Sequence, residues 1–163
     1  MKKDVLIYYD LITSLKTTLE VEGFISEIDT LMLTFFNNKG KTIKDALCLI
    51  SNDYAEKITQ IFAKNSLDIN NKDTFTDFLK ILKDLIQKLK VIKLILAFDP
   101  SKKTTEKLHS FVKETIGIGY ILDIEVSQDV LAGAIVVFDG KYKDFSLRKK
   151  IEEAFKTKMD LGL

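Results

Sequence analysis

Few residues in this sequence could carry acid–base, nucleophilic or metal chemistry. The 163 residues include one histidine, His109, and one cysteine, Cys48. His109 falls on the polar side of a predicted helix and has no partner at metal-ligand spacing, so we expect a solvated surface side chain. Cys48 stands in an apolar run. We interpret it as a small core residue, because reactive cysteines need an electropositive, partly exposed setting.

The remaining motifs do not favour catalysis. The seven glycines form neither a GxGxxG nor a GxxxxGK[ST] phosphate cradle, and the Asp and Glu residues are scattered along predicted helices. We therefore predict a non-catalytic protein with no catalytic residues, no metal and no cofactor. A small enzyme with a polar pocket at the domain junction near Asp99 is the minority alternative.

Composition restricts the class of protein further. Hydrophobic residues make up 46% and charged residues 30%, which is typical of a soluble globular chain. The formal net charge of +1 argues against a large phosphate-neutralising surface and hence against a nucleic-acid binder. No apolar run is long enough to span a membrane, and the N-terminal stretch lacks the features of a signal peptide, so we expect a cytoplasmic protein.

One cluster in the last third of the chain does carry a signal. Gly133 interrupts an apolar strand, a position usually kept for a bulge or for the close approach of another backbone. Asp144 or Ser146 can cap a following helix. Arg148, the only arginine, falls in the first helical turn, where the helix dipole disfavours a cation. Either it belongs to a tolerated surface cluster, or it folds back onto Asp144 or docks against an acidic partner.

The elements that position this cluster form two domains, which we place at residues 1–90 and 91–163. Apolar spacing and turn signals predict a bundle of five helices in the first domain. They run over Asp4–Leu19, Val21–Phe36, Thr42–Ile50, Tyr54–Lys64 and from the Asn70–Asp73 turn to Leu89. The first helix is apolar on more than one side, which is typical of a central helix or one covered by a partner.

The second domain is predicted to be a small α/β unit in the order strand, helix, strand, strand, helix. The near-continuous apolar run Val91–Phe98 indicates a buried strand. A helix follows Pro100, with Leu108, Phe111 and Val112 on its inner stripe. The remaining elements are strands at Tyr120–Val126 and Leu131–Phe138, an Asp139–Gly140 hairpin turn, a short strand at Lys141–Lys143 and a helix from Phe145 to Lys158.

The last third resembles the C-terminal region of the δ subunit, or oligomycin-sensitivity-conferring protein, of F-type ATP synthases. That family's pattern is roughly D-P-x-L-I-G-G, a strand, a turn, then D-x-S-x-R/K and a helix. Residues 127–133 keep the apolar pair and the second glycine but lose the D-P and the first glycine. The second part is intact as Asp144, Ser146 and Arg148. At the N-terminus, where the family has six helices, this chain resembles it in architecture alone and is shorter.

The resemblance implies a stator subunit on the cytoplasmic face of the membrane, part of a complex that makes ATP from proton transport. Its partners would be the N-terminal helices of the ATP synthase α subunits and the C-terminus of the peripheral-stalk b subunit. We expect the contact with the α subunits in a groove between the first and fifth helices, near Tyr9, Leu11 and Phe78. The stalk contact would involve Leu131, Gly133 and Arg148, with Asp144 and Ser146 of the same motif. An adaptor of another rotary or secretion complex is the alternative.

Overall fold

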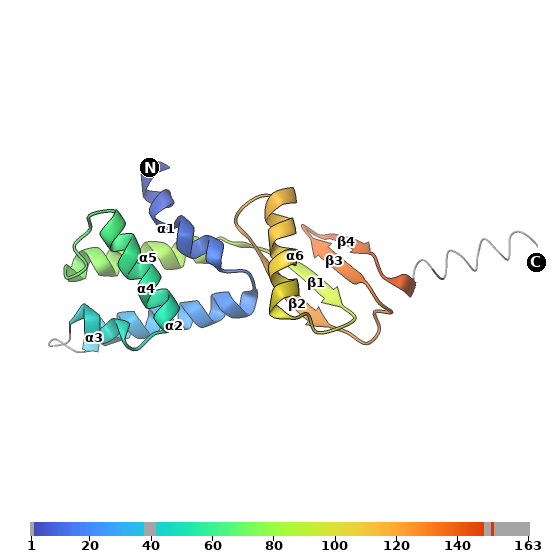
Figure 1. Ribbon diagram of the computed structural model, residues 1–163, viewed down its shortest axis with the longest axis horizontal. Coiled ribbons are helices and arrows are strands. Elements are labelled where there is room, and N and C mark those ends of the chain that lie inside the picture. Colours follow the sequence, from blue (N-terminus) through green and yellow to red (C-terminus); the bar gives the residue numbers. More distant parts are fainter. Residues whose placement is uncertain (1, 38–41, 149–150, 152–163) are drawn as a thin grey trace, which may run out of the picture. The chain divides into compact units, whose positions relative to one another are not determined.

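The computed structural model describes residues 2–37, 42–148 and 151, and the chain divides into two compact units (Figure 1). One unit comprises residues 1–15 and 19–89, and the other comprises residues 16–18 and 90–163. Helices make up the first unit, and a mixed sheet with one helix makes up the second, so the predicted fold class is confirmed. No helix in the described part of the chain is long and apolar enough to cross a membrane.

The helical elements follow the predicted apolar pattern. They are α1 (Lys2–Ser14), α2 (Thr18–Asn37), α3 (Ile43–Leu47), α4 (Asn52–Lys64) and α5 (Lys72–Gln87). Two of them start at side-chain caps. Thr42 and Asp45 form a capping box at α3, and the Asn71 side chain accepts hydrogen bonds from the Asp73 and Thr74 amides at α5. The predicted turn at residues 37–40 falls largely outside the described residues.

Aromatic rings fill the core of the helical unit. Tyr8 of α1 stacks on Phe78 of α5 with ring centroids 4.9 Å apart, and Phe62 of α4 meets the same Phe78 ring edge-on. The buried residues of α5 are Phe75, Phe78, Leu79, Leu82 and Ile86. In α1, Tyr8 and Leu11 are buried, as is Leu15 directly after its end, and the helix ends at Ser14 instead of Leu19. Leu19, predicted to end the first helix, belongs to α2 and is exposed.

The second unit is built on a four-stranded sheet. Its elements are β1 (Lys90–Leu96), α6 (Lys102–Thr115), β2 (Tyr120–Val126), β3 (Ala134–Phe138) and β4 (Lys141–Asp144). The strand order is β2-β1-β3-β4, with β1 parallel to β2 and the other pairs antiparallel. Asp139 and Gly140 both have positive φ and close the β3–β4 hairpin, as their sequence predicts.

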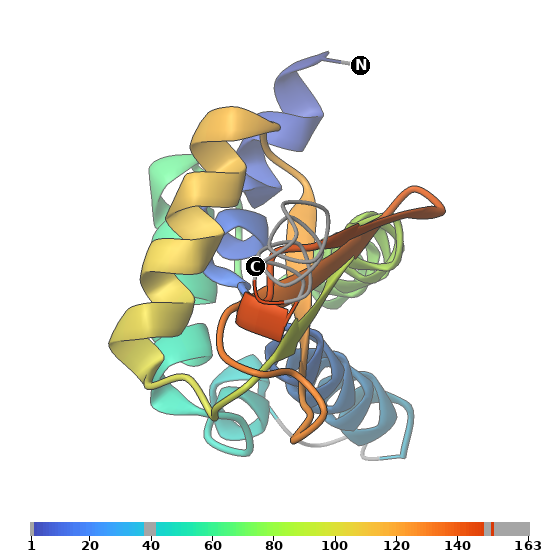
Figure 2. The ribbon, with the colours of Figure 1, turned by 90° about the vertical axis from the view of Figure 1, so that its right-hand side faces the viewer.

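Helix α6 lies along one face of this sheet (Figure 2). Ile92, Leu94 and Leu96 of β1 pack there with Leu122 of β2 and Val112 of α6. The alternate residues of β1 are less buried, and Val91 is exposed. The predicted strand is confirmed, but it is buried mainly on one face, because within the described residues only one face of the sheet carries a helix. Phe111, predicted to face inward, is 65% exposed.

The outer edge of β2 is partly covered by residues 16–18, which belong to this unit. Thr17 forms a parallel bridge with Leu122, whose amide donates to the Lys16 carbonyl at 2.8 Å. The Lys16 ammonium also pairs with Glu106 of α6 at 2.9 Å. This pairing joins segments about a hundred residues apart in sequence, so local sequence patterns do not predict it.

Candidate interaction site on the open face of the sheet

The two parts of the C-terminal motif pack directly against each other. The Phe145 amide donates to the Ala134 carbonyl at 2.9 Å, which extends the β3–β4 pairing by one residue. The Leu147 amide lies 3.0 Å from the carbonyl oxygens of both Leu131 and Ala132. The backbone from residue 131 to 134 is thereby held against the backbone from residue 145 to 147.

Gly133 lies at the closest point of this contact. A Cβ atom added there would be 2.5 Å from the Phe145 carbonyl oxygen and 3.1 Å from the Ser146 Cα. Its φ of +90° is also one that L-residues rarely adopt. The predicted close approach of another backbone is confirmed. The same geometry starts β3 at Ala134 instead of Leu131, because Ala132 and Gly133 both have left-handed φ values.

Asp144 caps the turn that leads out of the sheet. Its Oδ1 accepts a hydrogen bond of 2.7 Å from the Ser146 amide, and Ser146 is 3% exposed. Leu147, Arg148 and Ile151 are helical, which agrees with the start of the predicted helix. The rest of that helix, to Lys158, lies outside the described residues.

The sheet face opposite α6 carries an apolar centre between charged ends. Strand register places Glu125, Ile95, Ile135 and Asp144 in one row across all four strands. Side chains in such a row point to the same face. Ile95 and Ile135, at its centre, are only half-buried. This row therefore forms an amphipathic strip across the sheet.

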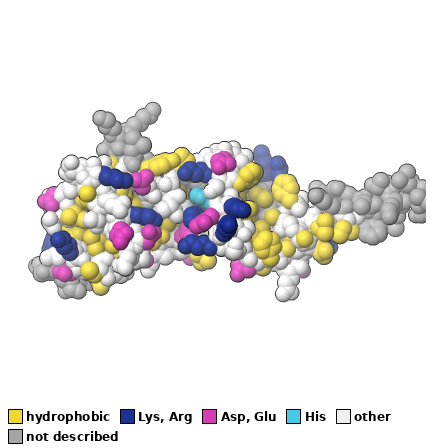
Figure 3. All heavy atoms as spheres, in the orientation of Figure 1, with side chains coloured by type: hydrophobic (Ala, Val, Ile, Leu, Met, Phe, Trp, Pro, Cys, Tyr) yellow, Lys and Arg dark blue, Asp and Glu magenta, His cyan; other side chains and the backbone are white. Residues whose placement is uncertain are grey.

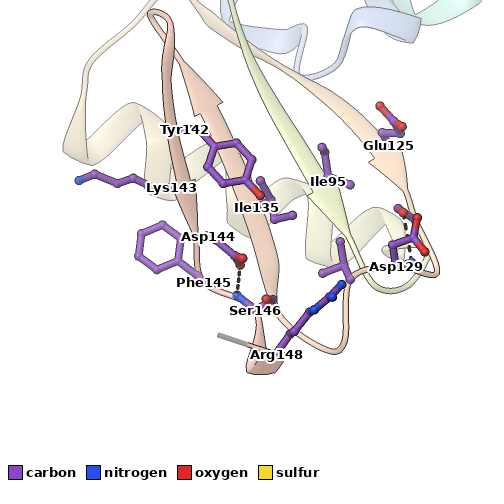
Figure 4. A pocket seen from close by; sticks show the side chains of 12 residues that line it. Ile95, Glu125, Asp129, Ile135, Tyr142, Lys143, Asp144, Phe145, Ser146 and Arg148 are labelled. Carbon is purple, nitrogen blue, oxygen red and sulfur yellow. Dashed lines mark hydrogen bonds between the residues drawn. The ribbon is translucent and has the colours of Figure 1, made fainter. Parts of the chain in front are cut away.

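A groove of about 980 Å³ lies over this strip (Figure 4). Tyr142 and Phe145 are on one side of it, with exposed fractions of 61% and 59%, and Glu125 and Asp129 are on the other. The other lining residues are Ile95, Ser127, Val130, Ile135, Lys143, Asp144, Ser146 and Arg148. The groove thus combines exposed aromatic rings with charges of both signs.

An ion pair lies next to the groove on the same sheet face. The Lys93 Nζ is 2.6 Å from Glu125 Oε2. The hydrogen bond and negative charge of Glu125 raise the pKa of Lys93 above its usual value, which keeps the ammonium charged. Both side chains are largely solvated, so the pair contributes little to stability. We infer that it orients the Glu125 side chain.

The arrangement is suited to recognition of a partner. Within residues 2–37, 42–148 and 151, no group of three or more His, Cys, Asp or Glu residues is placed to hold a metal. The groove contains neither His109 nor Cys48. Half-buried aliphatic side chains, exposed rings and charges of both signs are the features that an amphipathic protein segment can contact. Exposed apolar side chains on the described surface are visible as yellow patches in Figure 3.

The structure brings the predicted stalk-side residues together. Asp144, Ser146 and Arg148 line the groove, whereas Leu131 and Gly133 support it from the adjoining backbone. Sequence reasoning did not identify Ile95, Ile135 or Tyr142. Nor did it identify which residues lie beside Glu125, because only the strand register shows them.

Two of the three residues predicted to contact the α subunits are buried in the structure. Leu11 is fully buried and Phe78 is 3% exposed, whereas Tyr9 is 36% exposed. The seam between α1 and α5 is filled by Tyr8 stacked on Phe78. Leu11 and Phe78 are therefore core residues that a partner cannot contact on this surface, and of the three only Tyr9 is accessible. Leu11 follows Tyr8 by three residues and shares its helix face, so both side chains pack within the unit.

The expectations for Cys48 and His109 also need correction. Cys48 is exposed at the end of α3, not buried. His109 is partly buried, and its Nε2 lies 3.1 Å from the Tyr120 carbonyl oxygen. Because a carbonyl only accepts, this nitrogen carries the hydrogen, and the ring links α6 to the start of β2. Asp99, near which an enzyme pocket was considered, is exposed and does not line the groove.

Comparisons with known proteins gave likenesses among solved structures alone. No protein-family model matches the sequence, and no curated protein matches it. Among solved structures, a chain in the cryo-EM structure of the Polytomella F-ATP synthase in primary rotary state 3 is 22% identical. The likeness covers 47% of this chain and 100% of that chain, with a TM-score of 0.38. We base no conclusion on a likeness of this size.

Proposed function

We propose that the chain is a non-catalytic stator subunit of an F-type ATP synthase. It would link the α subunits of the catalytic head to the b subunit of the peripheral stalk, on the cytoplasmic face of the membrane. The observation that carries the proposal is the packing of the two motif segments on each other at Gly133. The residues that resemble the δ subunit family therefore support and line one groove.

In this proposal the groove over Ile95 and Ile135 receives the end of the stalk. A helix with an apolar stripe would cover the aliphatic centre, and basic residues flanking that stripe would meet Glu125 and Asp129. A sheet that packs against helices on both faces is a common stable layer architecture, so the face that carries no helix within the described residues has a physical reason to bind one. The helical unit would contact the α-subunit helices through exposed apolar positions such as Tyr9.

The stalk contact can be tested with two matched phenylalanines. Phe145 lines the groove and is 59% exposed, whereas Phe111 projects from α6 and is 65% exposed. Phe145→Ala should weaken binding of a synthetic peptide from the end of the b subunit about tenfold, the effect of losing one aromatic anchor. Phe111→Ala should leave that affinity unchanged. Calorimetric titration of the purified full chain measures both, and equal effects of the two variants contradict the groove assignment.

The head contact needs a separate experiment. The purified chain should bind a synthetic peptide of the α-subunit N-terminal helix, and Tyr9→Ala should weaken that binding. Leu33→Ala is the control, because Leu33 is 60% exposed on α2, away from the α1 position tested. If wild-type protein does not bind the peptide even at high micromolar concentration, the stator proposal fails.

A further inference from the structure

The two edges of the sheet are not equivalent. The outer edge of β2 is partly covered, since Thr17 pairs with Leu122. Strand β4 pairs with β3, and within residues 2–37, 42–148 and 151 no strand lies along its other edge. An uncovered edge presents backbone donors and acceptors to any extended segment of suitable chemistry.

The register identifies which backbone groups of β4 point outward. Phe138 and Lys141 flank the two-residue turn and form a hydrogen-bonded pair. Hydrogen-bonded and non-hydrogen-bonded pairs alternate along the strands, and the hydrogen bond from the Phe145 amide to the Ala134 carbonyl fits this alternation. Tyr142 lies opposite Val137 in the intervening position. In such a position the N–H and C=O groups point away from the partner strand. The Tyr142 backbone is therefore directed outward from the sheet.

The side chains of β4 restrict what could pair there. Lys141 and Lys143 flank Tyr142, and all three are exposed. The two lysines project to one face of the sheet and Tyr142 to the other, as strand alternation requires. A strand added at this edge would therefore place two of its side chains beside Lys141 and Lys143 on one face. The residue between those two would place its side chain beside the Tyr142 ring on the other face.

We propose that the β4 edge binds an extended acidic segment of a partner protein by strand addition. The segment pairs with the outward N–H and C=O of Tyr142. It carries Asp or Glu beside Lys141 and Lys143, and a β-branched or aromatic residue beside the Tyr142 ring. A second copy of this chain is disfavoured, because pairing two β4 edges about Tyr142 sets lysine against lysine. The proposal does not depend on the stator role.

A proline substitution at Tyr142 tests the backbone contact. Tyr142→Pro removes the outward N–H and leaves the β3–β4 hydrogen bonds in place, since proline is tolerated where the amide faces away from the ladder. Tyr142→Val is the matched control for loss of the ring, because it keeps the amide. The probe is a short synthetic peptide of alternating Glu and Val, titrated against the purified full chain, with a peptide of alternating Lys and Val as its control.

Wild-type protein and Tyr142→Val should both bind the Glu–Val peptide, and the Lys–Val peptide should not bind. Tyr142→Pro should lose binding while keeping the wild-type circular dichroism spectrum. Double charge reversal, Lys141→Glu with Lys143→Glu, should weaken Glu–Val binding about tenfold and confer binding of the Lys–Val peptide. Amide exchange should show protection of the Tyr142 amide on binding.

Several results would overturn the proposal. If Tyr142→Pro is folded and binds the Glu–Val peptide as tightly as Tyr142→Val, no strand is added at this edge. Equal affinity for the two peptides would show that Lys141 and Lys143 do not select an acidic segment. Concentration-dependent dimers that Tyr142→Pro abolishes would identify a second copy as the occupant. No binding of the Glu–Val peptide to any form would also refute the proposal.

Discussion

Replacing Gly133 by alanine tests the contact on which the groove depends. The added Cβ would lie 2.5 Å from the Phe145 carbonyl oxygen, and neither atom can rotate away, because the oxygen is a backbone atom and the backbone fixes the position of the Cβ. Gly140→Ala is the control, because Gly140 also has a positive φ, +70°, but nothing lies within 4 Å of a Cβ atom added there. The two variants share the backbone penalty and differ in the steric clash.

The magnitudes follow from these two contributions. A left-handed φ costs an alanine about 1–2 kcal/mol, and this applies at both positions. Forcing a methyl group into filled space costs roughly 1–3 kcal/mol more, and this applies at Gly133 alone. We therefore expect the free energy of unfolding to fall by about 2–5 kcal/mol in Gly133→Ala and by about 1–2 kcal/mol in Gly140→Ala.

Urea denaturation followed by far-ultraviolet circular dichroism measures the difference in stability. Amide hydrogen exchange of β3 and β4 localises it, since the loss should be largest where residues 131–134 meet residues 145–147. If Gly133→Ala is no less stable than Gly140→Ala, the two segments do not approach as closely as described. The assignment of the motif to one packed element would then be wrong.

Three further perturbations have defined outcomes. Burial and the nearby Glu20, Glu27 and Asp53 charges raise the pKa of Tyr54 from 10.0 to about 12, so stability is full below pH 10.0 and falls as the pH rises through about 12. Tyr54→Phe should remove this loss, as measured by thermal melting across that range. The Lys16 hydrogen bond and charge lower the pKa of Glu106, so Lys16→Met should raise that pKa in a carboxyl NMR titration, and Lys107→Met should not. Asn71→Ala removes the side-chain cap of α5 and should cost about 1 kcal/mol in urea denaturation, whereas Asn70→Ala next to it should cost less.

The pairing of residues 16–18 with β2 shows what local patterns omit. The helix period identifies α1 and α2, and the Asp139–Gly140 pair identifies the β3–β4 turn, because each depends on residues a few positions apart. The bridge from Thr17 to Leu122 depends on two segments about a hundred residues apart meeting in space. The spacing of apolar residues along the sequence does not predict this contact. For the same reason Leu11 and Phe78 could be named from their apolar character, but their burial against the same core could not.

The sequence alone determined the order of the elements in the described residues and the Asp139–Gly140 hairpin, and it restricted Gly133 to a bulge or a close backbone approach. Each follows from local stereochemistry: side-chain periodicity, a positive φ and the absence of a Cβ. Only the tertiary structure decided which residues share the open face of the sheet. Strand order and register align Glu125, Ile95, Ile135 and Asp144 in one row, and they bring Arg148 to the same groove. These are pairings between distant segments, which the packing of the whole unit selects.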